Sequence, residues 1–187
     1  MPENVFPLAR YGRRVGTRSE GERARRELLQ ALSRLAEGSV LVVDLAGLDV
    51  LSGSFADEVL AQTVAELVAG ALPGRYLVVA SPSDELLEDL EEKLRGRRLA
   101  VLASVGRSWR VVGQLPPHLA RALDWLSRRK EATSQELAQA LDVSVAGASV
   151  RLAELARLRL VHRVQRARPM GGIEHWATSL VSLKKTS

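Results

Sequence analysis

The stretch Thr133–Arg163, TSQELAQALDVSVAGASVRLAELARLRLVHR, decides the architecture of the C-terminal part of this chain. Thr133 and Ser134 supply oxygens that can cap a first short helix, and Glu136 suits its first turn. After a tight turn, Ser144 can cap a second helix, which is expected from about Val145 to Arg157. Two short helices joined in this way predict a helix-turn-helix, in which the second helix enters the major groove of DNA.

A strand pair is predicted directly after the two helices. Residues 160–166 have the composition of a strand, residues 168–172 form a turn with a Gly-Gly tip, and residues 173–177 form a returning strand. The arrangement resembles the wing of winged helix-turn-helix regulators. From Pro117 to Ser182 the chain most resembles the MarR and ArsR groups of bacterial and archaeal regulators. The resemblance implies a prokaryotic regulator that binds double-stranded DNA as a homodimer.

Composition and charge narrow the function further. The 187 residues include no cysteine, which excludes disulfides and thiolate metal sites. Residues 116–187 hold 12 basic and 6 acidic side chains, a net +6, whereas residues 1–115 hold 15 and 16, a net −1. Phosphate attraction needs the positive charge where the helix-turn-helix lies. The chain has no long apolar run and no apolar core of a signal peptide at its start, so we expect a cytoplasmic protein without a membrane partner.

Strands and helices alternate in the N-terminal part, which predicts an α/β sandwich with a central sheet. The expected domains are a sandwich over residues 1–112, a linker over 113–117 and a small α+β winged domain over 118–187. Apolar periodicity sets the expected elements. The strands are expected at 5–9, 40–45, 76–80, 98–103 and 109–112, and the helices at 19–37, 54–69, 84–94 and 118–129.

A short motif follows the second expected strand. That strand contains Asp44, and the run Ser52-Gly53-Ser54-Phe55-Ala56-Asp57-Glu58 leads into a helix. Together with Thr17-Arg18 before the preceding helix, the motif resembles the STAS-like family of unknown function, over about residues 5–112. Its wider relatives are the STAS domains of anti-sigma factor antagonists, which bind a kinase-type anti-sigma factor and are switched off by serine phosphorylation.

The resemblance implies that Ser54 occupies the phosphoacceptor position, although the acidic residue and the glycine of those relatives are missing here. A phosphate or a small anion at Ser52, Ser54 and Arg18 would meet the free amides of a helix start. The alternative is structural: the serines are ordinary N-caps, and Arg18 forms an ion pair with Asp57 or Glu58.

The expected DNA contacts lie on the second helix and the wing. Ser149 and Arg151 are the hydrogen-bonding side chains early in that helix, whereas its valines and alanines can touch only a thymine methyl. Arginines are expected mainly on phosphates, and the alternative for each is simple solvation. The expected DNA-binding residues are Ser144, Ser149, Arg151, Arg157, Arg159, Arg163, Arg166 and Arg168.

The chain lacks the motifs of an enzyme. No Gly-rich phosphate loop or nucleophile elbow occurs, and His118, His162 and His175 have no ligand spacing, so no catalysis, metal or cofactor is expected. Trp125 and Trp176 are expected in the core. The leading interpretation is a DNA-binding transcriptional regulator whose N-terminal domain senses a signal or binds a protein. The alternative is an anti-sigma-antagonist-like adaptor that binds a kinase-type ATPase under control of Ser54, with the winged domain docking protein.

Overall fold

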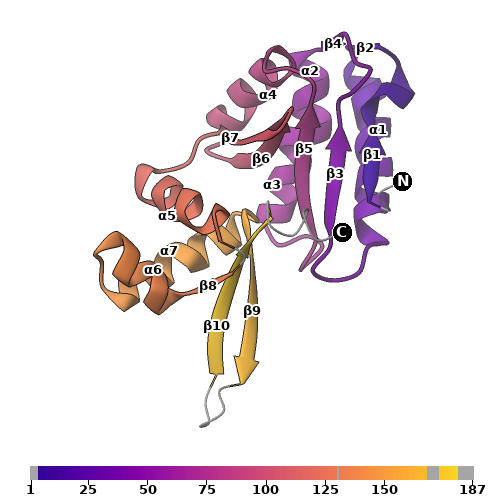
Figure 1. Cartoon of the computed structure of the whole chain (residues 1–187). Coiled ribbons are helices and arrows are strands. Elements are labelled where there is room, and N and C mark those ends of the chain that lie inside the picture. The colour runs from indigo at the N-terminus through magenta and orange to yellow at the C-terminus, as the bar shows by residue number, and fades with distance from the viewer. Residues whose placement is uncertain (1–3, 130, 168–172, 181–187) are drawn as a thin grey trace. The chain divides into compact units, whose positions relative to one another are not determined.

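The computed structural model describes residues 4–129, 131–167 and 173–180, and it divides into two compact units. Unit 1 is Met1–Leu115 and unit 2 is Pro116–Ser187. Figure 1 labels their helices and strands. A central, mostly parallel sheet with helices is followed by a winged helical domain, so the predicted fold class is confirmed. In the described part of the chain, no helix is both long enough and apolar enough to cross a membrane.

Unit 1 is built on a five-stranded sheet in the order β1-β3-β5-β6-β7. Its strands are β1 (Val5–Pro7), β3 (Val40–Asp44), β5 (Tyr76–Ser81), β6 (Ala100–Val105) and β7 (Ser108–Gly113). The first four are parallel, and β7 returns antiparallel to β6. A separate parallel pair joins β2 (Arg14–Val15) to β4 (Val50–Leu51). The apolar runs of β3, β5 and β6 suit such a sheet, because parallel strands lie inside their proteins.

Helices of unit 1 contact one another and pack on the sheet through a shared apolar core. They are α1 (Arg18–Ser33), α2 (Gly53–Ala56), the π-helical stretch η2 (Asp57–Ala61), α3 (Gln62–Val68) and α4 (Glu85–Gly96). The chain runs without a break through α2, η2 and α3. Phe55, Leu60 and Leu67 from this segment are fully or almost fully buried in the core.

The expected bounds are shifted in several elements, such as the strand expected at 98–103, which is β6 at Ala100–Val105, and three further differences have a visible cause or form. The first strand ends at Pro7, whose ring removes the N–H a longer strand would use, and Leu8–Tyr11 form a 3-10 helix instead. Helix α1 ends at Ser33 rather than at residue 37, and the Ser33 hydroxyl donates to the Gln30 carbonyl. The helix expected over 54–69 contains the π-helical stretch, which periodicity did not predict.

Gly113 closes unit 1 in a conformation that favours glycine. Its φ is +106°, and a Cβ there would stand 2.3 Å from the carbonyl oxygen of Leu99. This close approach lets the amide of Gln114 donate to the same carbonyl at 2.8 Å. Strand β7 therefore includes the first residue of the expected linker, and the two units divide between Leu115 and Pro116.

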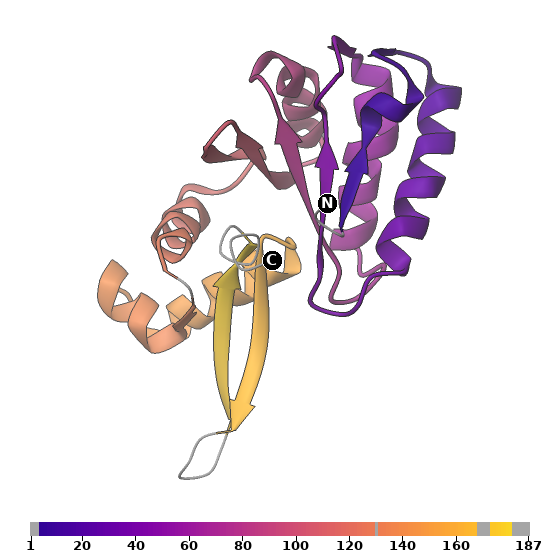
Figure 2. The same ribbon diagram turned by 45° about the vertical axis from the view of Figure 1, so that its right-hand side comes forward.

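Unit 2 is a helical trio with a three-stranded sheet in the order β8-β10-β9. Its elements are α5 (Pro117–Ser127), β8 (Ala132–Thr133), α6 (Ser134–Leu141), α7 (Val145–Arg157), β9 (Val161–Ala167) and β10 (Ile173–Ser179). Pro117 begins α5, where a proline costs no hydrogen bond. Strands β9 and β10 run antiparallel as a ribbon, seen as the pair of yellow arrows in Figure 2.

Candidate functional site

The helix-turn-helix of unit 2 is fixed by side-chain caps at both helix starts. Thr133 caps α6 in a reciprocal capping box, because Glu136 accepts from the Thr133 amide at 2.7 Å while the Thr133 hydroxyl accepts from the Glu136 amide. Asp142 ends α6 in the left-handed conformation, with φ at +52°. The Ser144 hydroxyl then accepts from the Gly147 amide at 3.0 Å and starts α7. The bounds predicted for α7 are confirmed.

Helix α7 buries one face and exposes the other. Ala148, Leu152 and Leu155 are buried within unit 2. The opposite face carries Val145, Ala146, Ser149, Val150, Ala153 and Arg157, of which only Ser149 is half-buried. At 100° per residue these six positions cover about 140° of the helix circumference. Val145 is 53% exposed and Val150 is 64% exposed. The exposed side chains of this face are therefore apolar from Val145 to Ala153, with the half-buried Ser149 among them and Arg157 at its end.

The predicted DNA-binding residues of α7 do not all share this face. Ser144 is exposed, but its hydroxyl already serves as the N-cap. Ser149 and Arg157 belong to the exposed face. Arg151 is half-buried, and its position lies about 160° around the helix from Ala153. The structure therefore does not bring Arg151 onto the face with Ser149, as the predicted base contact requires.

The arginines after α7 have different surroundings. Arg159 turns the chain into β9 with φ at +60° and is half-buried. Arg163 is half-buried on β9, and Arg166 is exposed near the end of that strand. Arg168 lies outside the described residues.

Arg166 anchors the wing to the segment before α6. Its guanidinium donates two hydrogen bonds to Glu131, at 2.9 and 2.7 Å, and lies 5.0 Å from the ring centroid of Trp176. The hydrogen bond to Glu131 raises the pKa of Arg166 above its usual value. Arg166 is predicted to contact a DNA phosphate, but in this structure it joins β9 to Glu131, just before β8.

The two tryptophans of unit 2 were expected in the core, and the structure places both at its edge. Trp125 and Trp176 are half-buried. Each ring is covered by a cation, with the Arg129 guanidinium 3.9 Å from the centroid of Trp125 and Arg166 over Trp176. Each ring thus has a guanidinium over one of its faces.

Residues 114–169 match the profile of the MarR family. This segment is a MarR-type winged helix domain. No curated protein matches the chain. A solved structure described as a "possible transcriptional regulator" from Methanosarcina mazei Go1 is similar over 38% of this chain and 62% of its own, with 12% identity and a TM-score of 0.34. The chain thus spans less than two thirds of that protein, and similarity at this level does not establish a shared fold.

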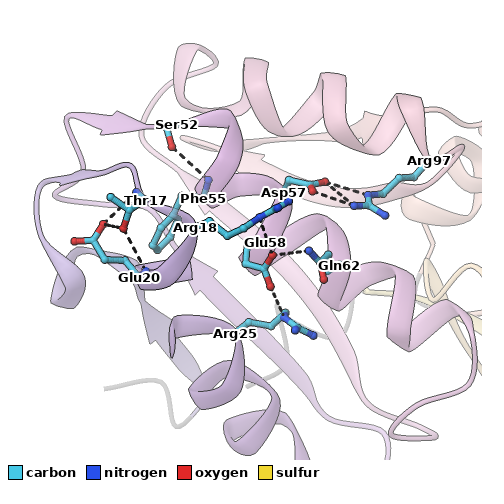
Figure 3. Close-up of polar contacts among 10 residues, drawn as sticks. All are labelled: Thr17, Arg18, Glu20, Arg25, Ser52, Phe55, Asp57, Glu58, Gln62 and Arg97. Carbon is cyan, nitrogen blue, oxygen red and sulfur yellow. Dashed lines mark hydrogen bonds and ion pairs between the residues drawn. The ribbon is translucent and has the colours of Figure 1, made fainter. Parts of the chain in front are cut away.

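Outside the MarR-type domain, the predicted anion site of unit 1 lies at the turn from β4 into α2. The Ser52 hydroxyl accepts from the Phe55 amide at 3.3 Å and donates to the Gly16 carbonyl at 3.0 Å, so Ser52 is the helix cap (Figure 3). Ser54 is exposed at the second position of α2 and is not the cap. The structural alternative is therefore correct for Ser52, while Ser54 keeps an exposed side chain.

Arg18 and the acids after the turn form ion pairs, as the structural alternative predicted. Arg18 Nε lies 3.7 Å from Glu58 Oε2, whereas Asp57 is held by a bidentate contact from Arg97 (Figure 3). Figure 3 also shows the capping box that starts α1, in which Thr17 and Glu20 bond to each other. Arg18 is thereby assigned a structural partner in this arrangement.

Sequence reasoning missed the most buried charge of unit 1. Glu58 is 4% exposed and accepts hydrogen bonds from Arg25 at 3.1 Å and from Gln62 at 2.6 Å. Arg25 also pairs with Glu66, and Gly21 leaves room for the acid because a Cβ there would lie 2.9 Å from that of Glu58. The spacing Arg25 to Glu58 crosses 33 residues, so only the tertiary fold joins them. Among the described residues, no cluster of His, Asp and Glu suits a metal ion.

Proposed function

We propose that this chain is a DNA-binding transcriptional regulator that contacts double-stranded DNA through α7 and the β9–β10 wing. One observation carries the proposal: a helix-turn-helix with a side-chain cap on each helix, together with the strand β9 that follows it, lies within the segment that matches the MarR family, and β10 pairs with β9 just beyond that segment. The exposed face of α7 supplies a surface for the major groove. The net charge of +6 in residues 116–187 supports attraction to phosphate.

Phosphate contacts dominate the proposed affinity. Among the described residues, Arg157 and Arg163 have no ion pair, so DNA phosphates would be their first anionic partners. Arg151, Arg159 and Arg168 complete the proposed set at the helix flank, the turn and the wing. Arg166 joins it only by leaving Glu131, and Ser144 contributes through the helix start that it caps rather than through a free hydroxyl.

Unit 1 is proposed to act as a STAS-like sensor or protein-interaction module within a homodimer. Its support is the exposed Ser54 beside the capped helix start, where a phosphate or a small anion meets the amides of the first turn. In this proposal, the signal received there alters the dimer and thereby the spacing of two winged domains on DNA.

A titration tests the DNA binding. The full-length protein is mixed with fluorescent genomic fragments at several salt concentrations, and anisotropy reports the dissociation constant. We expect log K to fall linearly with log salt, with a slope of about −0.9 for each neutralised phosphate. A flat salt response, or no binding even at low salt, would remove the proposal.

A second candidate function is an adaptor that binds a kinase-type ATPase under control of Ser54. The favouring observation is the same exposed hydroxyl, which no cap or partner role explains. A pull-down with the wild type and with Ser54→Ala should recover such an ATPase, and Ser54→Asp should not. If all three forms behave alike, the switch at Ser54 fails while the DNA-binding proposal stands.

A further inference from the structure

The exposed face of α7 presents methyl groups where readers of DNA sequence commonly present amides and guanidinium groups. Three large apolar side chains are exposed in the described part of the chain, and two of them, Val145 and Val150, lie on this face. Ala146 and Ala153 lie on the same face and are exposed. These four residues are called the methyl stripe below. Bidentate readout of adenine or guanine requires Asn, Gln or Arg, and the stripe contains none of them.

The major groove contains one apolar group that matches this chemistry. Each base edge there is polar except for the C5 methyl of thymine. The two valines are β-branched, so each holds essentially one side-chain rotamer in a helix. Their methyl positions are therefore fixed before binding, and a contact with thymine costs little conformational freedom.

The surroundings of the stripe favour DNA over a second copy of the chain. Arg157 ends the exposed face, and among the described residues neither it nor Arg163 on β9 has an ion pair. Two copies that meet through this face would bring unpaired arginines together, which is unfavourable. A nucleic acid duplex instead offers phosphates to the arginines and an apolar base edge to the valines.

We propose that the methyl stripe reads thymines through their C5 methyl groups and so gives the protein a preference for operators with thymines at fixed positions. Val145 and Val150 are the specificity-determining residues, and Ala146 and Ala153 keep the helix close to the groove floor. This inference rests on the proposed DNA binding. It adds the base that is recognised and the chemistry of recognition.

The test uses DNA that lacks only the methyl group. A random duplex library is selected for binding to the full-length protein, and the selected duplex is made again with deoxyuridine in place of each thymidine in turn. We expect about fourfold weaker binding for each contacted thymine, which corresponds to the burial of one methyl-sized group. Replacement of thymines outside the contacted positions should leave the dissociation constant unchanged.

A variant pair separates a direct contact from a change in duplex shape. Val145→Ser with Val150→Ser removes the methyl groups at exposed positions, and serine and valine have similar helix propensities. We expect this double variant to bind thymine and uracil duplexes equally. The matched control is Val50→Ser, which alters a 39% exposed valine in unit 1 and should keep the full uracil effect.

Each other outcome overturns the inference in a distinguishable way. If the wild type binds uracil duplexes as tightly as thymine duplexes, the methyl readout is wrong and the DNA-binding function stands. If the uracil effect persists in the double variant, thymine is read elsewhere. If the wild type shows no uracil effect, and sedimentation finds a dimer for the wild type and a monomer for the double variant, the stripe is a subunit contact. If no duplex is selected even at low salt, the proposed function fails too.

Discussion

Ion pairs with carboxylates are more frequent among the arginines of unit 1, where eight of fourteen form one, than among the described arginines of unit 2. In unit 1, Arg25 pairs with Glu58 and Glu66, and Arg97 holds Asp57 with both nitrogens of its fork. In the described residues of unit 2, carboxylates partner Arg128 and Arg166. Four further arginines there have no ion pair, namely Arg121, Arg151, Arg157 and Arg163.

The role of an arginine in this chain therefore depends on the acids around it and cannot be assigned from residue type alone. Unit 1 contains nearly equal numbers of acids and bases, and its Arg25 and Arg97 pair with acids on another helix. Unit 2 has half as many acids as bases, so positive charge remains for a partner outside the chain. Removing one partner of a buried ion pair is strongly destabilising, whereas removing a solvated charge costs little stability. Substitutions in the two sets should therefore change the free energy of unfolding by different amounts.

The strongest test of the paired set is Glu58→Ala. It leaves Arg25 partly buried with one carboxylate fewer, and we expect the free energy of unfolding of unit 1 to fall by about 3 kcal/mol. Denaturant unfolding followed by Trp109 fluorescence measures it in a chain with Trp125→Phe and Trp176→Phe. Asp49→Ala, which removes an exposed pair with Arg13, should cost under about 1 kcal/mol. Equal losses would contradict the comparison.

The unpaired set is tested by Arg157→Ala combined with Arg163→Ala. Both side chains are proposed phosphate contacts, so the slope of log K against log salt should become less steep by about 2, with similar weakening on every DNA sequence. Anisotropy titrations measure it. As the matched control, Arg95→Ala removes an arginine that pairs with Glu91 in unit 1 and should leave the slope unchanged. If the double variant has the same slope as the wild type, the two arginines do not contact phosphate and are simply solvated.

The two capping boxes allow a smaller, symmetrical test. Thr17→Ala should lower the stability of unit 1 and Thr133→Ala that of unit 2, each by about 1 kcal/mol, because each removes a cap from its helix. Single-tryptophan chains report the units separately. Loss of stability in both units from either substitution would show that the units do not unfold independently.

The smallest expected effect concerns Tyr11. Burial, and then the hydrogen bond that its hydroxyl donates to Glu27 at 2.7 Å, raise the pKa of Tyr11 from 10.0 to about 12. The folded state therefore favours the protonated phenol, and this contribution is present below pH 10 and lost as the pH rises through about 12. The stability advantage of the wild type over Tyr11→Phe should shrink between pH 9 and pH 12 in thermal melts. A constant difference would contradict the assignment.

The sequence predicted the elements that local signals define. Thr133, Glu136 and Ser144 lie at capping distances from the helices that follow, and the bounds of α7 were correct. Apolar runs located the strands of the sheet. Helix ends were less predictable, since α1 stops at Ser33 with no glycine there.

The candidate site was predictable in position but not in detail. Which face of α7 points outward depends on how the helix packs, and Arg151 and Val150 were therefore hard to assign from residue type. Arg166 and Glu131 lie 35 positions apart in the sequence, and no local pattern predicts their contact. Glu58 gave no signal of burial either, because acids early in a helix are usually solvated.

The π-helical stretch Asp57–Ala61 has a consequence for the length of the chain. A π turn holds one residue more than the α turns on either side of it. If the same residues wound as a regular α-helix, the two halves of the helix would turn by about 100° relative to each other. The Ser52 cap and the buried Leu67 could then not both keep their contacts. The π turn thus accommodates one residue between these two positions, and a chain one residue shorter there is expected to form a regular α-helix and to keep both contacts.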